Sequence, residues 1–408
     1  MKQLHVVGSF PVGTHTFVLW QMVGAHALGH QTAVLAANTG NDSGHQLAKQ
    51  LGLDEHTAIY ANYRTTTPWR PDLRRFTPAV ARAANKALYG RMLAERRKSF
   101  FCKLISMPEI RQVDLVQVHF INWAIDVGIP LARLLGLPCV VTAHGAVADT
   151  PVEFLRYTQE NADAIVVVSE SERQTWIDLT GSDRKLHRVW NGLPINGPLQ
   201  RTSKQPGSTL ELVTIGRLSP EKRVDDIVKA VAKLRESGFE CNLTIFGDGP
   251  LRKDLESQVM HLNLADRIRL KGIVQHEKVM EQLATADMLI HAADVEPFGL
   301  AMIEGMAAGL PVVAARSNGA AEILVHGTTG FLYEPGDVDS IVQHIIRLAK
   351  DESLKTTMGR AGRQRVEHEF SLDAHMGNME RIWAKALSEH ASNKRSFSAP
   401  TPIEGCKT

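Results

Sequence analysis

Two successive series of short apolar segments, each alternating with helical patterns, limit the folds open to this chain more than any other feature. The first series has β-rich apolar runs at 4–7, 115–118, 139–142 and 165–168, and the second has them at 210–215, 241–246, 268–270, 288–290 and 311–314. Short apolar strands that alternate with helices form a parallel sheet covered by helices on both faces. The sequence therefore predicts an α/β protein with two doubly wound, Rossmann-like domains.

The domain boundaries follow from a change of pattern after Val189. A polar stretch without periodicity marks 191–209 as a linker, and 408 residues suit two domains of roughly 150–200 residues each. We predict an N-terminal domain at 1–190, a C-terminal domain at 210–370, a helix at 371–392 that crosses back to the N-terminal domain, and a disordered tail at 393–408. Open α/β sheets bind ligands at the carboxyl ends of their strands, so we expect the two domains to face a central cleft.

Composition excludes several classes of protein. The net charge of +2 is too nearly balanced for a nucleic-acid-binding protein. The four cysteines are scattered without a C-x-x-C pair, so neither a zinc site nor a disulfide framework is expected. The amino-terminal apolar run is too short for a signal peptide, and no apolar run reaches about 18 residues, the length of a spanning helix. We therefore expect a cytoplasmic protein.

A concentrated basic stretch lies between Arg70 and Lys103, where ten Lys and Arg residues face only Asp72 and Glu95. Apolar residues are interleaved with these charges. Such a segment can lie on an anionic membrane surface at the inner face of the membrane, where a lipid-linked substrate would be found. The alternative is a solvated helical excursion from the N-terminal sheet.

The segment 296–304 places two carboxylates, Glu296 and Glu304, eight residues apart around a predicted helix start. The amide groups of the first helical turn and the helix dipole form an anion site, which suits a diphosphate. Glu304, about two turns into the helix, can accept hydrogen bonds from ribose hydroxyls, and Glu296 can do so from sugar hydroxyls. The alternative is that both glutamates cap and solvate an ordinary surface helix.

A second loop, 216–222, follows the strand at 210–215 and opens another helix. Its cations Arg217 and Lys222 stand beside a helix N-terminus, an arrangement that favours a dianionic ligand. Taken alone, the two side chains could equally be solvated loop charges.

Together these segments resemble the C-terminal half of the retaining glycosyltransferase family four, which has the GT-B fold. The resemblance covers 216–222, 246–250, 296–304 and 318–322. It implies that Arg217 and Lys222 hold the diphosphate of a nucleotide-sugar donor, that Glu296 contacts the transferred sugar, and that Glu304 contacts the ribose. It further assigns donor contacts to the backbone at Gly216, Phe298, Gly299 and Leu300.

Two positions depart from the family pattern. Asn318 precedes Gly319 where many members have Gly-Gly, and Arg223 follows Lys222 where many members have Gly. The second change is expected to alter the stiffness of the loop more than its chemistry.

The amino-terminal segments 8–11 and 16–18 resemble the opening of exopolysaccharide transferases of this family, including those for colanic-acid-like polymers. Gly13 allows close backbone approach to the donor. Thr14 and His15 replace a Ser-Glu pair found in many relatives, and they are assigned to the acceptor side or the cleft. No Lys follows Gly13 and Thr14 as in a Walker A loop, so a mononucleotide P-loop is not expected.

Two histidines stand at strand ends of the first series, His119 after 115–118 and His144 after 139–142. By the resemblance His144 contacts the donor sugar near the reacting carbon, and we class it as catalytic. His119 either faces the acceptor or cleft or is a structural hydrogen-bonding residue. Ser169 is expected to cap the following helix.

The predicted function is transfer of a sugar, with retention, from a UDP- or GDP-sugar to a glycan or lipid-diphosphate-linked acceptor in bacterial surface polysaccharide synthesis. Cationic side chains and helix amides stabilise the leaving diphosphate in this scheme, which requires no metal and no other cofactor. Three alternatives remain: a GT-B-fold nucleotide-sugar epimerase, an NAD-dependent oxidoreductase, and a non-catalytic binding protein. The second lacks the G-x-G-x-x-G fingerprint after the first strand.

Overall fold

The structure of the protein is a computed structural model that describes residues 1–10, 16–39, 57–59, 112–121, 123–145, 147–195 and 209–394, together with 48–49, 101, 104–105, 107, 110 and 197. The chain divides into two compact units. The first comprises the described residues of Met1–Val166, Leu179–His187 and Met379–Thr408, and the second comprises those of Val167–Asp178 and Arg188–Asn378.

The first sheet has seven strands in the order β3-β2-β1-β4-β5-β6-β7. The registered pairs between β3, β2, β1, β4 and β5 are parallel. The strands are β1 (Lys2–Phe10), β2 (Gln31–Thr39), β3 (Thr57–Ile59), β4 (Leu115–His119), β5 (Cys139–Ala143), β6 (Ala164–Val167) and β7 (Leu186–Arg188). The chain first moves outward from β1 to β3 and then returns to β4 on the other side of β1, so β1 and β4 meet at the topological switch point.

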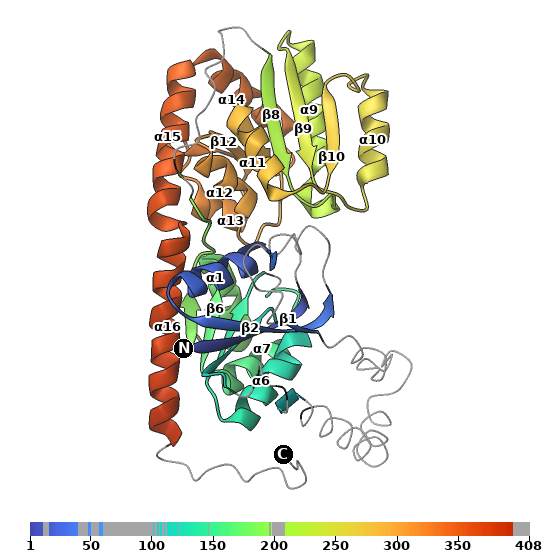
Figure 1. The fold of residues 1–408 in the computed structure, drawn as a ribbon. Coiled ribbons are helices and arrows are strands. Elements are labelled where there is room, and N and C mark those ends of the chain that lie inside the picture. Colours follow the sequence, from blue (N-terminus) through green and yellow to red (C-terminus); the bar gives the residue numbers. More distant parts are fainter. Residues whose placement is uncertain are drawn as a thin grey trace. The chain divides into compact units, whose positions relative to one another are not determined.

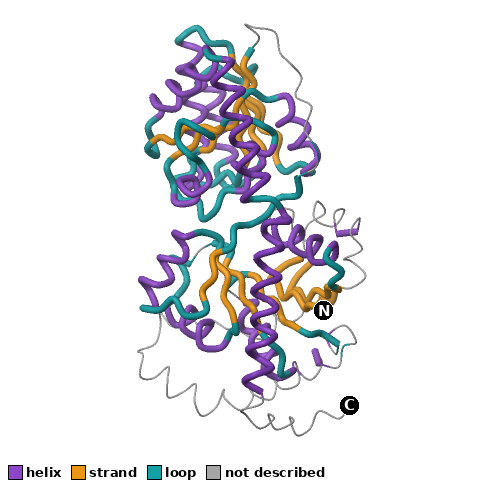
Figure 2. Tube along the Cα trace, turned by 90° about the vertical axis from the view of Figure 1, so that its left-hand side faces the viewer, coloured by secondary structure: helices purple, strands orange, loops and turns teal. Residues whose placement is uncertain are grey.

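The helices that connect these strands and are described are α1 (Thr16–Ala27), α6 (Trp123–Leu135), α7 (Val152–Asn161) and α8 (Glu170–Thr180). Every residue of β4, β5 and β6 is buried. Strands with this burial need cover on both faces, as the parallel, helix-connected arrangement provides. Figure 2 shows the strands lying among helices.

The second sheet has six strands in the order β10-β9-β8-β11-β12-β13, with all pairs parallel. Its switch point lies between β8 and β11. The strands are β8 (Leu210–Ile215), β9 (Cys241–Phe246), β10 (Ile268–Gly272), β11 (Met288–His291), β12 (Val312–Ala315) and β13 (Gly330–Tyr333). Both predicted parallel, doubly wound sheets are confirmed.

Helices pack on both faces of the second sheet and bury a separate core on each. Along β11, Met288 and Ile290 enter the core shared with α9 and α14, whereas Leu289 enters the core shared with α11 and α12. Figure 1 shows α9 beside β9 and α10 beyond β10. The helices are α9 (Val224–Glu236), α10 (Arg252–His261), α11 (His276–Thr285), α12 (Leu300–Ala307), α13 (Asn318–Ile323), α14 (Val338–Lys350), α15 (Glu352–Glu369) and α16 (Leu372–Lys394), with the 3₁₀ helix η3 (Pro220–Lys222) before α9.

The carboxyl-terminal helix α16 belongs to both units. Its residues to Asn378 group with the second unit, and those from Met379 group with the first. There the buried Trp383 indole donates a hydrogen bond to the Gln117 side chain of β4 at 2.9 Å. Within the expected linker, Leu193 is buried and forms an isolated parallel bridge with Ser371, so this part of 191–209 is packed chain. Residues 198–208 and 395–408 of the expected linker and tail lie outside the described residues.

Two helical glycines test how tightly the fold is packed. A Cβ on Gly359 of α15 would lie 2.1 Å from the Gly309 carbonyl oxygen, while one on Gly377 of α16 would meet nothing within 4 Å. We expect Gly359→Ala to lower the free energy of unfolding, because overpacking costs about 1–3 kcal/mol and outweighs a helix-propensity gain of about 1 kcal/mol. Gly377→Ala, the matched control, should raise it by roughly 0.5–1 kcal/mol. Denaturant unfolding measures both, and equal stabilisation by the two substitutions would contradict the close packing of α15.

Candidate functional site

Three loops meet at the switch point of the second sheet, at the carboxyl ends of β8, β9 and β11. Gly216 donates to the Phe246 carbonyl at 2.9 Å, and Leu218 donates to the Asp248 carbonyl at 3.0 Å. The loop after β11 is tied to η3, because the Asp294 amide donates to the Glu221 carbonyl at 3.1 Å. Since ligands of open α/β sheets bind at the switch point, these loops form the candidate site.

Glycine is required where the first two loops touch. Gly247 has φ +127°, and a Cβ there would lie 1.8 Å from the Gly216 carbonyl oxygen. A Cβ on Gly249 would lie 2.4 Å from the Leu218 carbonyl oxygen. No side chain fits at either position, so the backbones of 216–222 and 246–250 are locked together and carry Arg217 and Lys222 at a fixed place.

The Glu296 carboxylate is the electrostatic centre of the site. Its Oε2 atom lies 2.7 Å from Lys222 Nζ and 3.0 Å from His291 Nε2. Burial alone would raise the pKa of this carboxyl, but the hydrogen bond and charge of His291 and the charge of Lys222 outweigh it and lower the pKa to about 2. Glu296 is therefore an anion at neutral pH, joined to a cation that the sequence assigned to phosphate binding.

The start of α12 lies directly beside this cluster. Gly299 caps the helix with φ +111°, where a Cβ would come within 2.1 Å of the Met302 side chain. The Gly319 amide donates to the Glu296 carbonyl at 2.9 Å, and a Cβ on Gly319 would lie 2.3 Å from the Phe298 carbonyl oxygen. Amides of a first helical turn have no intrahelical acceptor, so the start of α12 offers donors to an anion.

Glu304 lies one turn further along α12 and is buried. Its Oε1 atom is 3.5 Å from Nδ1 of His276, at the start of α11. Burial raises the pKa of Glu304, and the nearby His276 lowers it in part. The two residues form a polar pair adjoining the helix start, with hydrogen-bonding capacity suited to hydroxyl groups.

Arg217 is exposed at the end of β8, on the same loop as Lys222. The departure from the family pattern at Arg223 has a structural explanation. Arg223 adopts a left-handed backbone with φ +46°, the conformation for which glycine is usually chosen. Its guanidinium pairs with Asp226 at 2.6 Å and stands 3.9 Å from Asp294, so side-chain contacts hold the turn.

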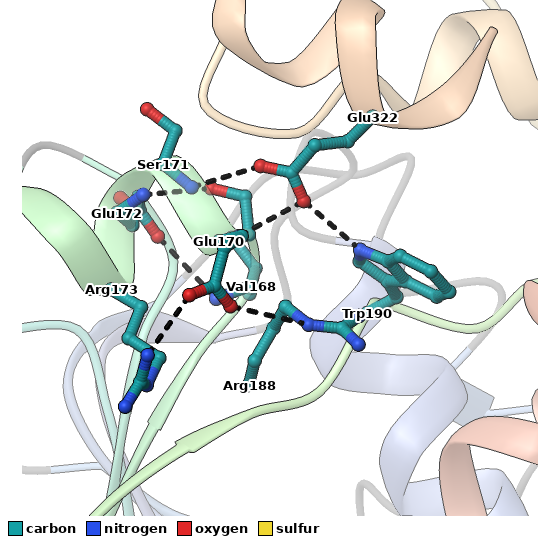
Figure 3. A network of polar contacts seen from close by, with 9 residues as sticks. Val168, Glu170, Ser171, Glu172, Arg173, Arg188, Trp190 and Glu322 are labelled. Atoms are coloured by element: carbon teal, nitrogen blue, oxygen red, sulfur yellow. Dashed lines mark hydrogen bonds and ion pairs between the residues drawn. The ribbon is translucent and has the colours of Figure 1, made fainter. Parts of the chain in front are cut away.

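Glu322 of α13 has contacts of another kind, which Figure 3 shows. Its carboxylate accepts hydrogen bonds from the Glu170 and Ser171 amides at 2.9 Å each and from the Trp190 indole at 3.3 Å. Glu322 thus caps the start of α8 from a distant helix. The predicted cap Ser169 is confirmed, since its hydroxyl accepts from the Glu172 amide at 3.1 Å.

In the first unit, the two predicted strand-end histidines are joined. His119 Nδ1 lies 3.0 Å from His144 Nε2, and His119 Nε2 lies 2.9 Å from His5 Nδ1 on β1. His119 is fully buried between the other two rings, whereas His144 is half-buried at the end of β5. Any contact of His119 with a substrate would therefore pass through His144.

Several predicted site residues lie outside the described residues, namely Gly13, Thr14 and His15. The basic stretch 70–103 also lies outside them, apart from Phe101. Among the residues that the structure does describe, no group of three or more His, Cys, Asp or Glu side chains could hold a metal ion. No helix in the described part of the chain is long and apolar enough to cross a membrane.

Sequence reasoning missed His5, His276 and His291. A signal existed for His291, because it is the last residue of its strand, as His119 is of β4. His5 lies inside an apolar strand, and His276 begins a helix that the pattern did not link to the site. Their partners become visible only when distant segments are brought together.

Comparison with known proteins covers both halves of the chain. Residues 13–196 match the family model described as Glycosyltransferase Family 4, and residues 199–365 match that described as Glycosyl transferases group 1. The chain is 27% identical over 307 residues to the N-acetyl-alpha-D-glucosaminyl L-malate synthase of Bacillus anthracis, covering 72% of this chain and 80% of that protein. It is 24% identical over 403 residues to the putative colanic acid biosynthesis glycosyltransferase WcaL of Salmonella typhimurium, covering 92% and 97%.

Solved structures with the same fold cover nearly the whole chain. Anabaena HepE in complex with UDP and glucose superposes with a TM-score of 0.72 at 20% identity, over 94% of this chain and 99% of that one. A glycosyltransferase from Rickettsia africae gives 0.74 at 17% identity, over 95% and 98%. At such identities the likeness concerns the fold.

The pKa of Glu296 gives a testable pH dependence. A carboxyl whose pKa falls from its ordinary 4.5 to about 2 on folding stabilises the fold above pH 4.5, and this contribution is lost as the pH falls toward 2. Between pH 7 and pH 4 the wild-type chain should lose about 1 kcal/mol of unfolding free energy that Glu296→Gln does not lose. Urea unfolding at the two pH values measures the difference, and parallel losses in both proteins would rule out the proposed charge cluster.

Proposed function

Since the chain belongs to the family-four glycosyltransferases and has their GT-B fold, we propose that it transfers a sugar from a nucleoside diphosphate sugar with retention of anomeric configuration. The observation that carries the proposal is the cluster of Lys222, His291 and Glu296 beside the start of α12. It combines a cation, an anion and the start of a helix, whose first amides are available to a ligand, at the switch point of the second sheet.

The diphosphate is proposed to bind between Arg217, Lys222 and the first-turn amides of α12. A diphosphate needs several donors and positive charge, which this end of the sheet supplies from two loops held together by their glycines. Lys222 is already oriented by Glu296, so little side-chain freedom is lost when the phosphate arrives.

The remaining contacts assign the two other parts of the donor. Glu304, one turn along α12, and His276, at the start of α11, form a pair beside the phosphate site that can receive ribose hydroxyls. Glu296 is an anion with only 12% of its side chain exposed, and its carboxylate can accept hydrogen bonds from hydroxyls of the transferred sugar.

In the proposed reaction the acceptor hydroxyl attacks the anomeric carbon from the face that the diphosphate leaves. The acceptor O–H bond breaks as the new C–O bond forms, and the bond to the diphosphate oxygen breaks with its electron pair. A leaving phosphate oxygen takes the proton. Arg217, Lys222 and the amides of 298–300 stabilise the charge that develops there, and electrostatic stabilisation of this kind is usually the largest single contribution to an enzyme's rate.

The acceptor is proposed to be a glycan or a lipid-diphosphate-linked oligosaccharide in bacterial surface polysaccharide synthesis. Support comes from the likeness over 92% of this chain to a putative colanic acid biosynthesis enzyme. The proposal includes a cytoplasmic location at the inner face of a membrane, with the basic stretch 70–103 in contact with anionic lipid.

Two cation variants test the phosphate site. We expect Arg217→Ala and Lys222→Ala each to reduce turnover by about 10²–10³-fold, as the loss of one charge-stabilising donor does in other enzymes. Lys229→Ala serves as the control, since Lys229 pairs with Asp225 and Asp226 on α9. Steady-state rates with thermal unfolding curves separate activity from folding. Wild-type rates in both site variants would remove the phosphate assignment.

The donor and the stereochemistry can be tested together. A UDP-, GDP- or ADP-sugar that binds the folded chain should raise its melting temperature. At a ligand concentration of one hundred times Kd, the free energy of unfolding should increase by about 2.7 kcal/mol. With that donor and an acceptor, early NMR spectra should show a product with the donor's anomeric configuration. An inverted product would contradict retention. Conversion of the donor to its 2-epimer without acceptor would instead establish the epimerase alternative.

A further inference from the structure

A row of four side chains, Gln3, His5, His119 and His144, crosses three neighbouring strands of the first sheet. Gln3 Oε1 lies 3.1 Å from His5 Nε2, and the two contacts between the histidines measure 2.9 and 3.0 Å. Each pair of histidine rings is stacked, with centroids 5.3 Å apart and planes 13° from parallel.

The strand register explains how the row forms. His5 lies opposite Gln117 on β4, and His119 lies opposite Thr142 on β5. His119 therefore lies two residues beyond Gln117, the residue opposite His5, and His144 lies two residues beyond Thr142, the residue opposite His119. A displacement of two keeps side chains on the same face of a sheet, so the row runs obliquely toward the carboxyl ends of the strands. It ends at His144, beyond the last residue of β5.

Burial separates the inner part of the row from water. Gln3, His5 and His119 are all fully buried, whereas His144 is half-buried and flanked by Phe17 and Phe120, with ring centroids 4.5 and 5.0 Å away. Burial lowers the pKa of His5 to about 3, so its ring is neutral. A neutral imidazole has one N–H donor and one bare nitrogen, and the partners decide which is which.

With the Gln3 amide oriented so that Oε1 faces His5 Nε2, one assignment of protons fits the whole row. The Gln3 carbonyl oxygen can only accept, so His5 carries its proton on Nε2 and accepts at Nδ1. His119 then donates from Nε2 and accepts at Nδ1, and His144 donates from Nε2. Reversal of the Gln3 amide would reverse all three rings together, which makes the row a single two-state element.

We propose that Gln3, His5 and His119 are positioning residues that fix His144 as the neutral Nε2–H tautomer, with Nδ1 as a hydrogen-bond acceptor for a sugar hydroxyl. The identity of the ligand rests on the proposed function, whereas the tautomer does not. The sugar hydroxyl donates to His144, and the buried row prevents the ring from turning or changing its donor.

The same geometry argues against a proton relay. A relay needs a base at its far end, and the row ends at a neutral amide, which takes no proton at ordinary pH. His5, the next residue, is buried and resists protonation. A proton that entered at His144 would find no group to hold it, so the row orients a side chain and does not carry protons.

The test measures the tautomer of His144 in the full-length protein without any donor. Imidazole ¹⁵N shifts, with the His144 signals assigned by their loss in His144→Gln, should show a bare Nδ1 and a protonated Nε2. Gln3→Met removes the acceptor and should give a mixture of tautomers.

Two further variants separate hydrogen bonding from packing. His5→Phe retains an aromatic ring but breaks the row. It should release the His144 tautomer and lower kcat/KM about 10-fold, the lower end of the loss seen when metal-binding histidines lose the partner that orients them. His5→Asn places an amide oxygen near the former position of Nδ1. It should restore much of the single His144 tautomer and much of the wild-type kcat/KM. His187→Phe, a half-buried histidine outside the row, is the matched control and should change neither.

The outcomes are distinct. If His5→Phe does not fold, Gln3→Met decides by itself. A wild-type His144 protonated on Nδ1, or an unchanged tautomer in both Gln3→Met and His5→Phe, would overturn the proposal. A fixed Nε2–H tautomer in a protein that binds no nucleotide sugar would instead preserve this inference and contradict the proposed function.

Discussion

The candidate site depends on one interaction, the sharing of the buried Glu296 carboxylate between Lys222 and His291. It joins the loop after β8 to the loop after β11 across the switch point, through side chains that are far apart in sequence. Without its two partners the carboxylate would be buried without compensation, and burial would then favour its neutral form. The ion pair therefore fixes both the charge of the site and the relative position of its two loops.

Backbone segments also approach each other closely at the strand ends, at positions where only glycine leaves enough space. Gly247 and Gly249 bring two loops into contact, and Gly319 brings the start of α13 against the loop before α12. These contacts place loop amides and helix starts without needing side chains for support. The donors offered to an anion are thus part of the backbone framework, which costs little reorganisation when a ligand binds.

Much of the fold followed from sequence because parallel, fully buried strands leave a local pattern. The runs 115–118 and 288–290 fall within β4 and β11, His119 is the last residue of β4, and Glu296 lies on the loop after β11. Loop position and resemblance identify Lys222 and Glu296 as site residues. Their direct contact cannot be predicted from the sequence, because 73 residues lie between them and only the sheet order brings them together.

Two residues have roles that their place in the sequence does not reveal. His5 resembles any other position of an apolar strand, and its meaning comes from the register that aligns it with His119. Arg223 looks like a disturbance of a glycine position, yet its backbone adopts the glycine-like conformation and its side chain is held by Asp226. In each case tertiary contacts, which no local pattern records, decide the role.

The glycines at the strand ends are unequal in what they permit. Positions 247 and 249 admit no larger residue, but a Cβ on Gly216 would meet nothing within 4 Å. Residue 216 can therefore accept a side chain without displacing the two loops, provided that its amide still donates to Phe246, whereas positions 247 and 249 cannot.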